Sequence, residues 1–151
     1  MVKAKIGDVL ELGTPSGLAY LHYLGKHATY GAAIAVSKRT YVSRQPVNAA
    51  LFNSSYVTFY TLAPCLRLQL VTVVGNVQSP GLPKSYRRPG AMEGRKVLTW
   101  VIEDSDGIDI AVRKKLSERE LLLPIAGIWN HEYLVIRVTQ SWSPEHEGHQ
   151  D

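Results

Sequence analysis

The clearest β-hairpin signal in the chain lies in residues 97–113, which read VLTWVIEDSDGIDIAVR. In its first half the apolar residues Leu98, Trp100 and Ile102 recur at every second position, which is the period of a strand. Residues 104–107, DSDG, supply the Asp and Gly that a tight turn requires. Apolar residues then alternate again over 108–113. The stretch therefore predicts an antiparallel hairpin.

The segments on either side also favour short strands. Branched and aromatic residues fill them, and Gly, Pro, Asn or Ser clusters separate them. Ser117 and Glu120 form a capping box that predicts a short helix ending before Pro124. Pro46 precedes a helical turn expected over 49–52. The further strands predicted are residues 7–12, 18–24, 30–36, 56–62, 66–74 and 133–139.

Length and composition indicate one globular domain. The chain has 151 residues, of which 45% are hydrophobic and 20% charged. The pattern predicts a mostly β fold, an antiparallel barrel or sandwich of about seven or eight short strands with one or two short helices. We expect the domain to span residues 1–142, followed by a flexible polar tail over residues 143–151.

The compartment is expected to be reducing. Cys65 is the only cysteine, so no intramolecular disulfide forms, and its apolar neighbours predict a buried thiol. The sequence contains no run of 18 apolar residues, so no membrane span is predicted. The first residues lack the apolar core of a signal peptide. These features favour the cytoplasm.

Motifs for catalysis and metal binding are absent from the sequence. It contains no phosphate-binding glycine loop, nucleophile elbow or zinc-binding H-E-x-x-H. His22 and His27 lack the third ligand that zinc requires, and residues 104–109 lack the final glutamate of a calcium loop. We therefore predict neither a metal site nor a cofactor, and a protein that is not an enzyme. An enzyme with an unrecognised site stays as a third hypothesis.

A basic segment is the most informative candidate for binding. Residues 78–96 are rich in Pro and Gly and predict a long surface loop, which is either functional or simply solvated. Tyr86 is the aromatic residue beside the arginines, and Arg with an adjacent aromatic suits contact with phosphates and bases. The net charge of the chain is +4, which suits an anionic partner. The cations of this loop are Lys84, Arg87, Arg88, Arg95 and Lys96.

Two tryptophans lie in informative positions. Trp100 alternates with apolar residues and is predicted to lie in the core. Trp129 follows Gly127 and Ile128 in a turn, where it either plugs one end of a barrel or anchors a partner. We favour the plug slightly and keep Trp129 among the candidate contact residues.

Short motifs at the N-terminus resemble bacterial immunity proteins of the Imm26 type. The segments are Gly7-Asp8-Val9-Leu10-Glu11-Leu12, Gly17-Leu18-Ala19-Tyr20 and Tyr30-Gly31, which together span about the first quarter of the chain. Leu123-Pro124-Ile125 and Gly127-Ile128-Trp129 are similar to segments of related bacterial proteins. The resemblance implies a mostly β cytosolic protein that neutralises a cognate toxin by binding it, with no cofactor and no catalysis.

The leading hypothesis is thus a non-enzymatic protein-binding module, an immunity-type inhibitor of a bacterial toxin that uses the basic loop and nearby aromatic residues. The alternative is a small basic β-barrel that binds RNA or DNA through residues 84–96. The sequence leaves the oligomeric state open.

Overall fold

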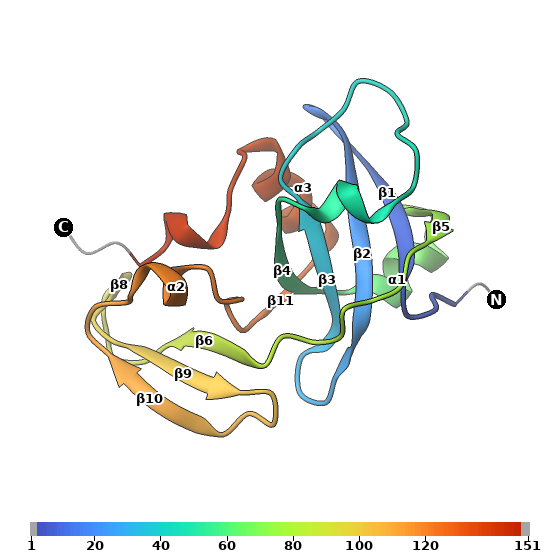
Figure 1. The fold of residues 1–151 in the computed structure, drawn as a ribbon. Coiled ribbons are helices and arrows are strands. Elements are labelled where there is room, and N and C mark those ends of the chain that lie inside the picture. The colour runs from blue at the N-terminus through green and yellow to red at the C-terminus, as the bar shows by residue number, and fades with distance from the viewer. Residues whose placement is uncertain (1–2, 149–151) are drawn as a thin grey trace.

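The computed structural model describes residues 3–148, and a six-stranded sheet dominates it (Figure 1). The strand order is β11-β4-β3-β2-β1-β5. Neighbouring strands are antiparallel, except that β11 runs parallel to β4. The strands are β1 (Asp8–Thr14), β2 (Gly17–His27), β3 (Gly31–Ser37), β4 (Ser55–Tyr60), β5 (Thr72–Asn76) and β11 (Ile128–Trp129).

The turn between β1 and β2 depends on glycine. Gly17 has a φ of +124°, a region that other residues rarely adopt. A Cβ on Gly17 would also lie 2.6 Å from the carbonyl oxygen of Tyr41, which bridges to Leu18. This glycine therefore permits both the β1–β2 turn and the close contact with Tyr41, which lies in the loop after β3.

One face of this sheet is covered by helices. Helix α1 (Leu62–Arg67) and helix α3 (His131–Thr139) pack their apolar residues against it, and Trp142 closes the cluster. Removing these side chains from water is the main force that holds the layers together. The sheet side chains of this core include Leu10, Leu12, Leu21, Ile34 and Val36, and the helical ones are Leu62, Cys65, Leu66, Leu134 and Val138.

The opposite face is covered by a loop and by a second sheet. The 3-10 helix η1 (Ala49–Phe52) packs against Val9 and Tyr20, while Tyr86 packs against Phe59. Tyr86 belongs to a three-stranded sheet of order β10-β9-β6, which comprises β6 (Ser85–Pro89), β9 (Trp100–Asp104) and β10 (Asp109–Arg113). A short hairpin of β7 (Met92–Glu93) and β8 (Lys96–Val97) extends it.

Helix α2 (Glu118–Leu121) covers the inner face of the three-stranded sheet. Its residue Leu121 packs with Leu116 against Trp100 and Ile102, so Trp100 lies in the core as predicted. The capping box is also confirmed, because Ser117 Oγ accepts from the Glu120 amide and the Glu120 carboxylate accepts from the Ser117 amide. Cys65 is buried, as its apolar neighbours predicted.

The mostly β prediction is confirmed, and of the two architectures it offered the structure is sandwich-like and has no closed barrel among residues 3–148. The predicted strand at 133–139 is wrong. Leu134 and Val138, four residues apart, are buried, whereas Ile136 between them is 52% exposed, and this is a helical pattern. Asn130 caps the helix, its side chain accepting from the amide of Tyr133.

The predicted strand over residues 66–74 is also wrong in its first part. Residues 62–67 form α1, with Pro64 in the first turn, where a backbone N–H has no helical partner to lose. The helix ends at Leu68, and Gln69 adopts a φ of +59°. The strand β5 begins only at Thr72, so the alternation of Leu66, Leu68 and Leu70 does not mark a strand.

The predicted tail is packed over much of its length. Residues 143–148, called the C-terminal strap below, include the 3-10 helix η2 (Pro144–His146), and Ser143 and Pro144 are buried. The prediction of a flexible tail is therefore wrong for these residues, and residues 149–151 lie outside the described part. Within residues 3–148, no helix combines the length and the apolar character needed to cross a membrane.

Candidate protein-binding surface

The predicted basic loop is in large part strand, and two of its candidate residues are buried. Tyr86 and Arg87 in β6 are both 0% exposed. Tyr86 packs against Phe59 and His27 of the large sheet, with its ring centroid 5.3 Å from that of Phe59. The prediction that Tyr86 and Arg87 form an exposed contact site is therefore wrong, because Tyr86 packs against the large sheet and Arg87 is covered by α2 and the C-terminal strap.

Arg87 is held by backbone carbonyls instead of a carboxylate. Its Nη2 donates to the carbonyl oxygens of Leu121 at 3.2 Å, Pro144 at 2.6 Å and Glu147 at 2.8 Å. Burial lowers the pKa of Arg87 to about 10, so the side chain stays charged at neutral pH. Two of the three carbonyls come from the C-terminal strap, so the strap stabilises a buried cation by hydrogen bonding.

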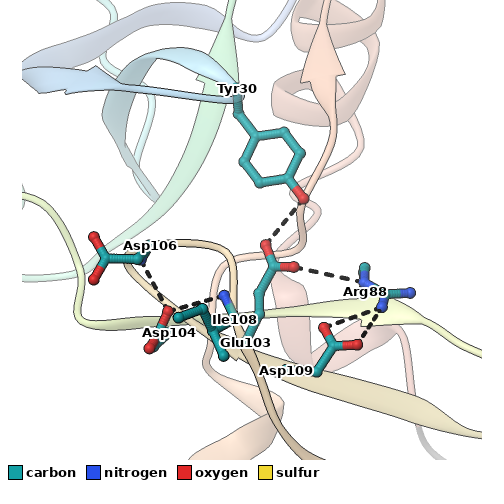
Figure 2. A network of polar contacts seen from close by, with 7 residues as sticks. All are labelled: Tyr30, Arg88, Glu103, Asp104, Asp106, Ile108 and Asp109. Atoms are coloured by element: carbon teal, nitrogen blue, oxygen red, sulfur yellow. Dashed lines mark hydrogen bonds and ion pairs between the residues drawn. The ribbon is translucent and has the colours of Figure 1, made fainter.

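Arg88 lies in a network of charges between the two sheets (Figure 2). Its Nε is 3.5 Å from the carboxylate of Glu103, and its Nη2 donates to both carboxylate oxygens of Asp109. Glu103 is 3% exposed and also accepts from the hydroxyl of Tyr30 at 2.9 Å. Burial, followed by this hydrogen bond, raises the pKa of Tyr30. The charge of Arg88 is thus paired with the carboxylates of Glu103 and Asp109 within the chain.

The acidic tip of the β9–β10 hairpin is a turn, as predicted. Oδ1 of Asp104 accepts from the amides of Asp106 at 2.9 Å and Ile108 at 3.0 Å (Figure 2). This arrangement uses the Asp side chain as a local backbone partner. Within residues 3–148, no group of three or more His, Cys, Asp or Glu side chains is placed to hold a metal ion.

The exposed cations of the basic segment lie at opposite ends of the three-stranded sheet. Lys84 precedes β6 where Ser85 pairs with Asp104, at the acidic tip. Arg95 and Lys96 lie in the β7–β8 hairpin, which extends from the other end, where Pro89 pairs with Trp100. The structure therefore separates Lys84 from Arg95 and Lys96.

Two further lysines join Arg95 and Lys96. Strand β10 ends at Arg113, which also pairs with Trp100, so Lys114 and Lys115 follow at the same end of the sheet. All four side chains are exposed. They form no ion pair with another described residue. This end of the sheet is therefore cationic.

Exposed apolar side chains lie in and just before β10, which is an edge strand with β9 on one side only. Ile108, Ile110 and Val112 are 60%, 59% and 62% exposed. We call these three residues, together with Arg95, Lys96, Lys114 and Lys115, the β10 surface. Sequence reasoning placed the apolar residues in a hairpin but missed them as a site. A signal was present in the sequence: Trp100, Val101 and Ile102 are consecutive apolar residues, which is typical of a strand buried on both faces, whereas charged residues begin and end β10.

Trp129 lies away from this surface. It belongs to β11, and its ring packs against Tyr133 at 5.0 Å, Trp142 at 5.1 Å and Tyr56 at 6.1 Å between centroids. These rings belong to the helical side of the large sheet. Trp129 is half-buried there and packs on the core. The structure thus does not bring Trp129 together with the basic residues.

Comparison of this chain with protein-family models, with curated proteins and with solved structures finds no match.

Proposed function

We propose that this chain is a non-enzymatic protein-binding module, an immunity-type inhibitor whose β10 surface covers an acidic and apolar face of a toxin. The observation that carries the proposal is a group of exposed apolar side chains, Ile108, Ile110 and Val112, at and just before an edge strand whose far end is cationic. Exposed apolar side chains beside a charged rim are typical of surfaces that other proteins cover.

The chemistry of these exposed side chains favours a macromolecular partner. Ile110 and Val112 of β10, and Ile108 just before it, present apolar area to water, and covering these side chains is favourable for the reasons that drive folding. The cations Arg95, Lys96, Lys114 and Lys115 at one end select an acidic partner and accelerate the encounter.

The register of β10 argues against simple strand addition. Pairing with β9 shifts between Asp109 and Ala111, which places a bulge at Ile110. Bulges on edge strands discourage pairing with another strand, including that of a second copy of the chain. We therefore expect the partner to pack against the side chains of β10.

The nucleic-acid alternative has lost its aromatic contact. Tyr86 was the residue expected to stack on bases, and it is fully buried, as is Arg87. The cations of the β10 surface flank apolar side chains, which form no favourable contact with phosphate groups. Binding of RNA or DNA becomes an outcome of the experiment below.

The resemblance of residues 7–12 and 17–20 to immunity proteins supports an inhibitor. We propose that it acts in the cytoplasm, which agrees with the buried single thiol of Cys65.

The test is affinity capture of the partner from the native cell, with and without nuclease, followed by titration of the purified pair. We expect one protein at equal stoichiometry that resists nuclease. Ile110→Asp should abolish binding, because it places a charge in the apolar contact. Lys114→Glu with Lys115→Glu should weaken binding about tenfold, in a salt-dependent way. The partner expressed alone should arrest growth, and co-expression of this chain should restore it.

Leu68→Asp is the matched control, since Leu68 is 67% exposed at the end of α1 and lies outside the β10 surface. This variant should bind the partner normally. A partner that binds Ile110→Asp as tightly as the parent chain would overturn the proposal. Recovery of nucleic acid alone, lost at high salt, would replace it with the alternative.

A further inference from the structure

A cavity of about 520 Å³ opens between α1 and the strands β2, β3 and β4 of the large sheet. Its volume lies within the range of sites that hold small molecules, roughly 300–1,000 Å³. Lys26 of β2 pairs in register with Ala32 of β3, and both line the cavity. The cavity contains none of the residues of the β10 surface.

The interior of the cavity is apolar. The small side chain of Ala32 and the absent side chain of Gly31 leave space above the sheet, and Leu62 and Leu66 of α1 form a wall. The remaining apolar lining residues are Ala4, Ala63, Pro64 and Ile128. An apolar body of a ligand, such as an alkyl chain, gains free energy by entering such a space.

Three tyrosines line the cavity, and two of their hydroxyls already have protein partners. The hydroxyl of Tyr30 donates to Glu103, and that of Tyr60 is 3.1 Å from Nδ1 of His131. Burial raises the pKa of Tyr60, which keeps this hydroxyl protonated. The hydroxyl of Tyr23 has no hydrogen-bond partner among residues 3–148, so polar recognition of a ligand falls to Tyr23 and to the charged side chains of the lining.

The charged side chains of the lining are three cations, Lys3, Lys26 and Arg67, all exposed to solvent. The lining residues include no Asp or Glu. None of the three cations forms an ion pair with another residue of 3–148, whereas the guanidinium groups of Arg44 and Arg113 do. An apolar cavity surrounded by uncompensated positive charge is complementary to an amphiphilic anion.

We propose that this cavity binds a small organic anion, with its apolar body between α1 and the sheet and its single carboxylate or phosphate head beside Lys3, Lys26 and Arg67. Both heads are oxygen anions that lysine and arginine recognise. This site is separate from the proposed protein-binding surface, so ligand and partner can be tested independently.

The test is calorimetric titration of the full chain with four compounds that share a ten-carbon tail. Undecanoate and decyl phosphate carry the anionic head, decanol carries a neutral one, and decyltrimethylammonium carries a cation. We expect the anions to bind at one site and decanol to bind at least about tenfold more weakly, since it loses the ionic contacts. The cation should not bind. The tighter of the two anions identifies the head group.

Variants separate the ionic contact from the apolar one. Lys26→Gln with Arg67→Gln should weaken binding of the anions about tenfold and leave decanol unchanged. Ala63→Trp should block all tails, because Ala63 is an exposed lining residue of α1. The matched control is Lys114→Gln with Lys115→Gln, which removes equal charge at the β10 surface and should leave anion binding unchanged.

Each variant is first checked for an unaltered thermal unfolding transition. Equal binding of all four compounds would overturn the proposal, because it would show non-specific uptake of tails. Anion binding that is equally weak in the control and in the Lys26 and Arg67 variant would also overturn it, since net charge alone would then explain the preference.

Discussion

The guanidinium of Arg87 lies over the indole ring of Trp100, with Cζ 4.2 Å from the ring centroid. Both residues are buried, and they come from the neighbouring strands β6 and β9. A desolvated cation over tryptophan is the strongest form of this interaction. Together with the carbonyls that accept from Nη2, the ring stabilises a buried positive charge that forms no ion pair with another residue of 3–148.

Arg87→Ala should destabilise the protein by about 3 kcal/mol, because it leaves buried carbonyls without a donor and opens a void beside Trp100. Urea denaturation followed by tryptophan fluorescence measures the change in unfolding free energy. Arg95→Ala is the control, since Arg95 is exposed in the β7–β8 hairpin and should change stability by less than about 0.5 kcal/mol. Equal stabilities of the two variants would contradict the role assigned to Arg87.

Removal of the chain after Trp142 should destabilise the protein by a similar amount, about 2–4 kcal/mol, because Arg87 would lose two of its three carbonyl partners and the buried Ser143 and Pro144 would be absent. Thermal unfolding measured by circular dichroism checks this. Glu147→Ala is the matched control: it removes the ion pair with Arg137 but keeps the backbone carbonyl. A truncated chain as stable as Glu147→Ala would show that the C-terminal strap does not hold Arg87.

Tyr30→Phe should lower stability by about 1–2 kcal/mol, because the buried carboxylate of Glu103 would lose its hydroxyl donor. A double-mutant cycle with Glu103→Gln should give a coupling of at least about 0.5 kcal/mol between the two residues. Tyr23→Phe serves as the control, since no described residue is hydrogen-bonded to the Tyr23 hydroxyl. Additive effects of Tyr30→Phe and Glu103→Gln would mean that this contact is energetically silent.

Glu11 should contribute a pH-dependent part of the stability. Hydrogen bonds from Arg44 and then from Tyr20 lower the pKa of Glu11 below its ordinary value of 4.5. Its stabilising contribution is therefore present above pH 4.5 and is lost as the pH falls through the lowered folded-state value.

Glu11→Gln should accordingly show a smaller loss of stability between pH 6 and pH 3 than the parent chain, as measured by urea denaturation at each pH. Glu93→Gln, an exposed change in β7, is the comparison and should retain the parent's slope. A Glu11→Gln chain with the same slope as the parent would rule out this linkage.

The strands that pair with a neighbour across a short turn could be predicted from the sequence. Residues 100–104 and 109–113 alternate and surround their own turn, so the hairpin of β9 and β10 needs no distant information. The N-terminal hairpin was equally accessible from its turn at residues 13–17. Helix α3 could not be predicted in this way, because its apolar residues fit both periods. Leu134, Ile136 and Val138 fit the period of two of a strand, and Leu134 and Val138 fit the spacing of four of a helix. Only the sheet that buries two of them decides the outcome.

The candidate site was hidden for a related reason. A cluster of arginines with prolines reads as exposed, yet Arg87 is buried by carbonyls that lie 57 and 60 residues further along the chain. No local pattern announces such a partner. The apolar residues of β10 were visible in the sequence, but their exposure follows from the position of the strand at an edge, and strand order is a property of the whole fold.

The distance in sequence between Arg87 and its acceptors also determines when these hydrogen bonds can form during synthesis of the chain. When β6 has been synthesised, the carbonyls of Pro144 and Glu147 do not yet exist, because they follow 57 and 60 residues later. The large sheet from β1 to β5 is complete earlier, apart from β11. Until translation passes the C-terminal strap, Arg87 therefore lacks two of its three carbonyl acceptors, and a chain that ends before residue 144 lacks them permanently.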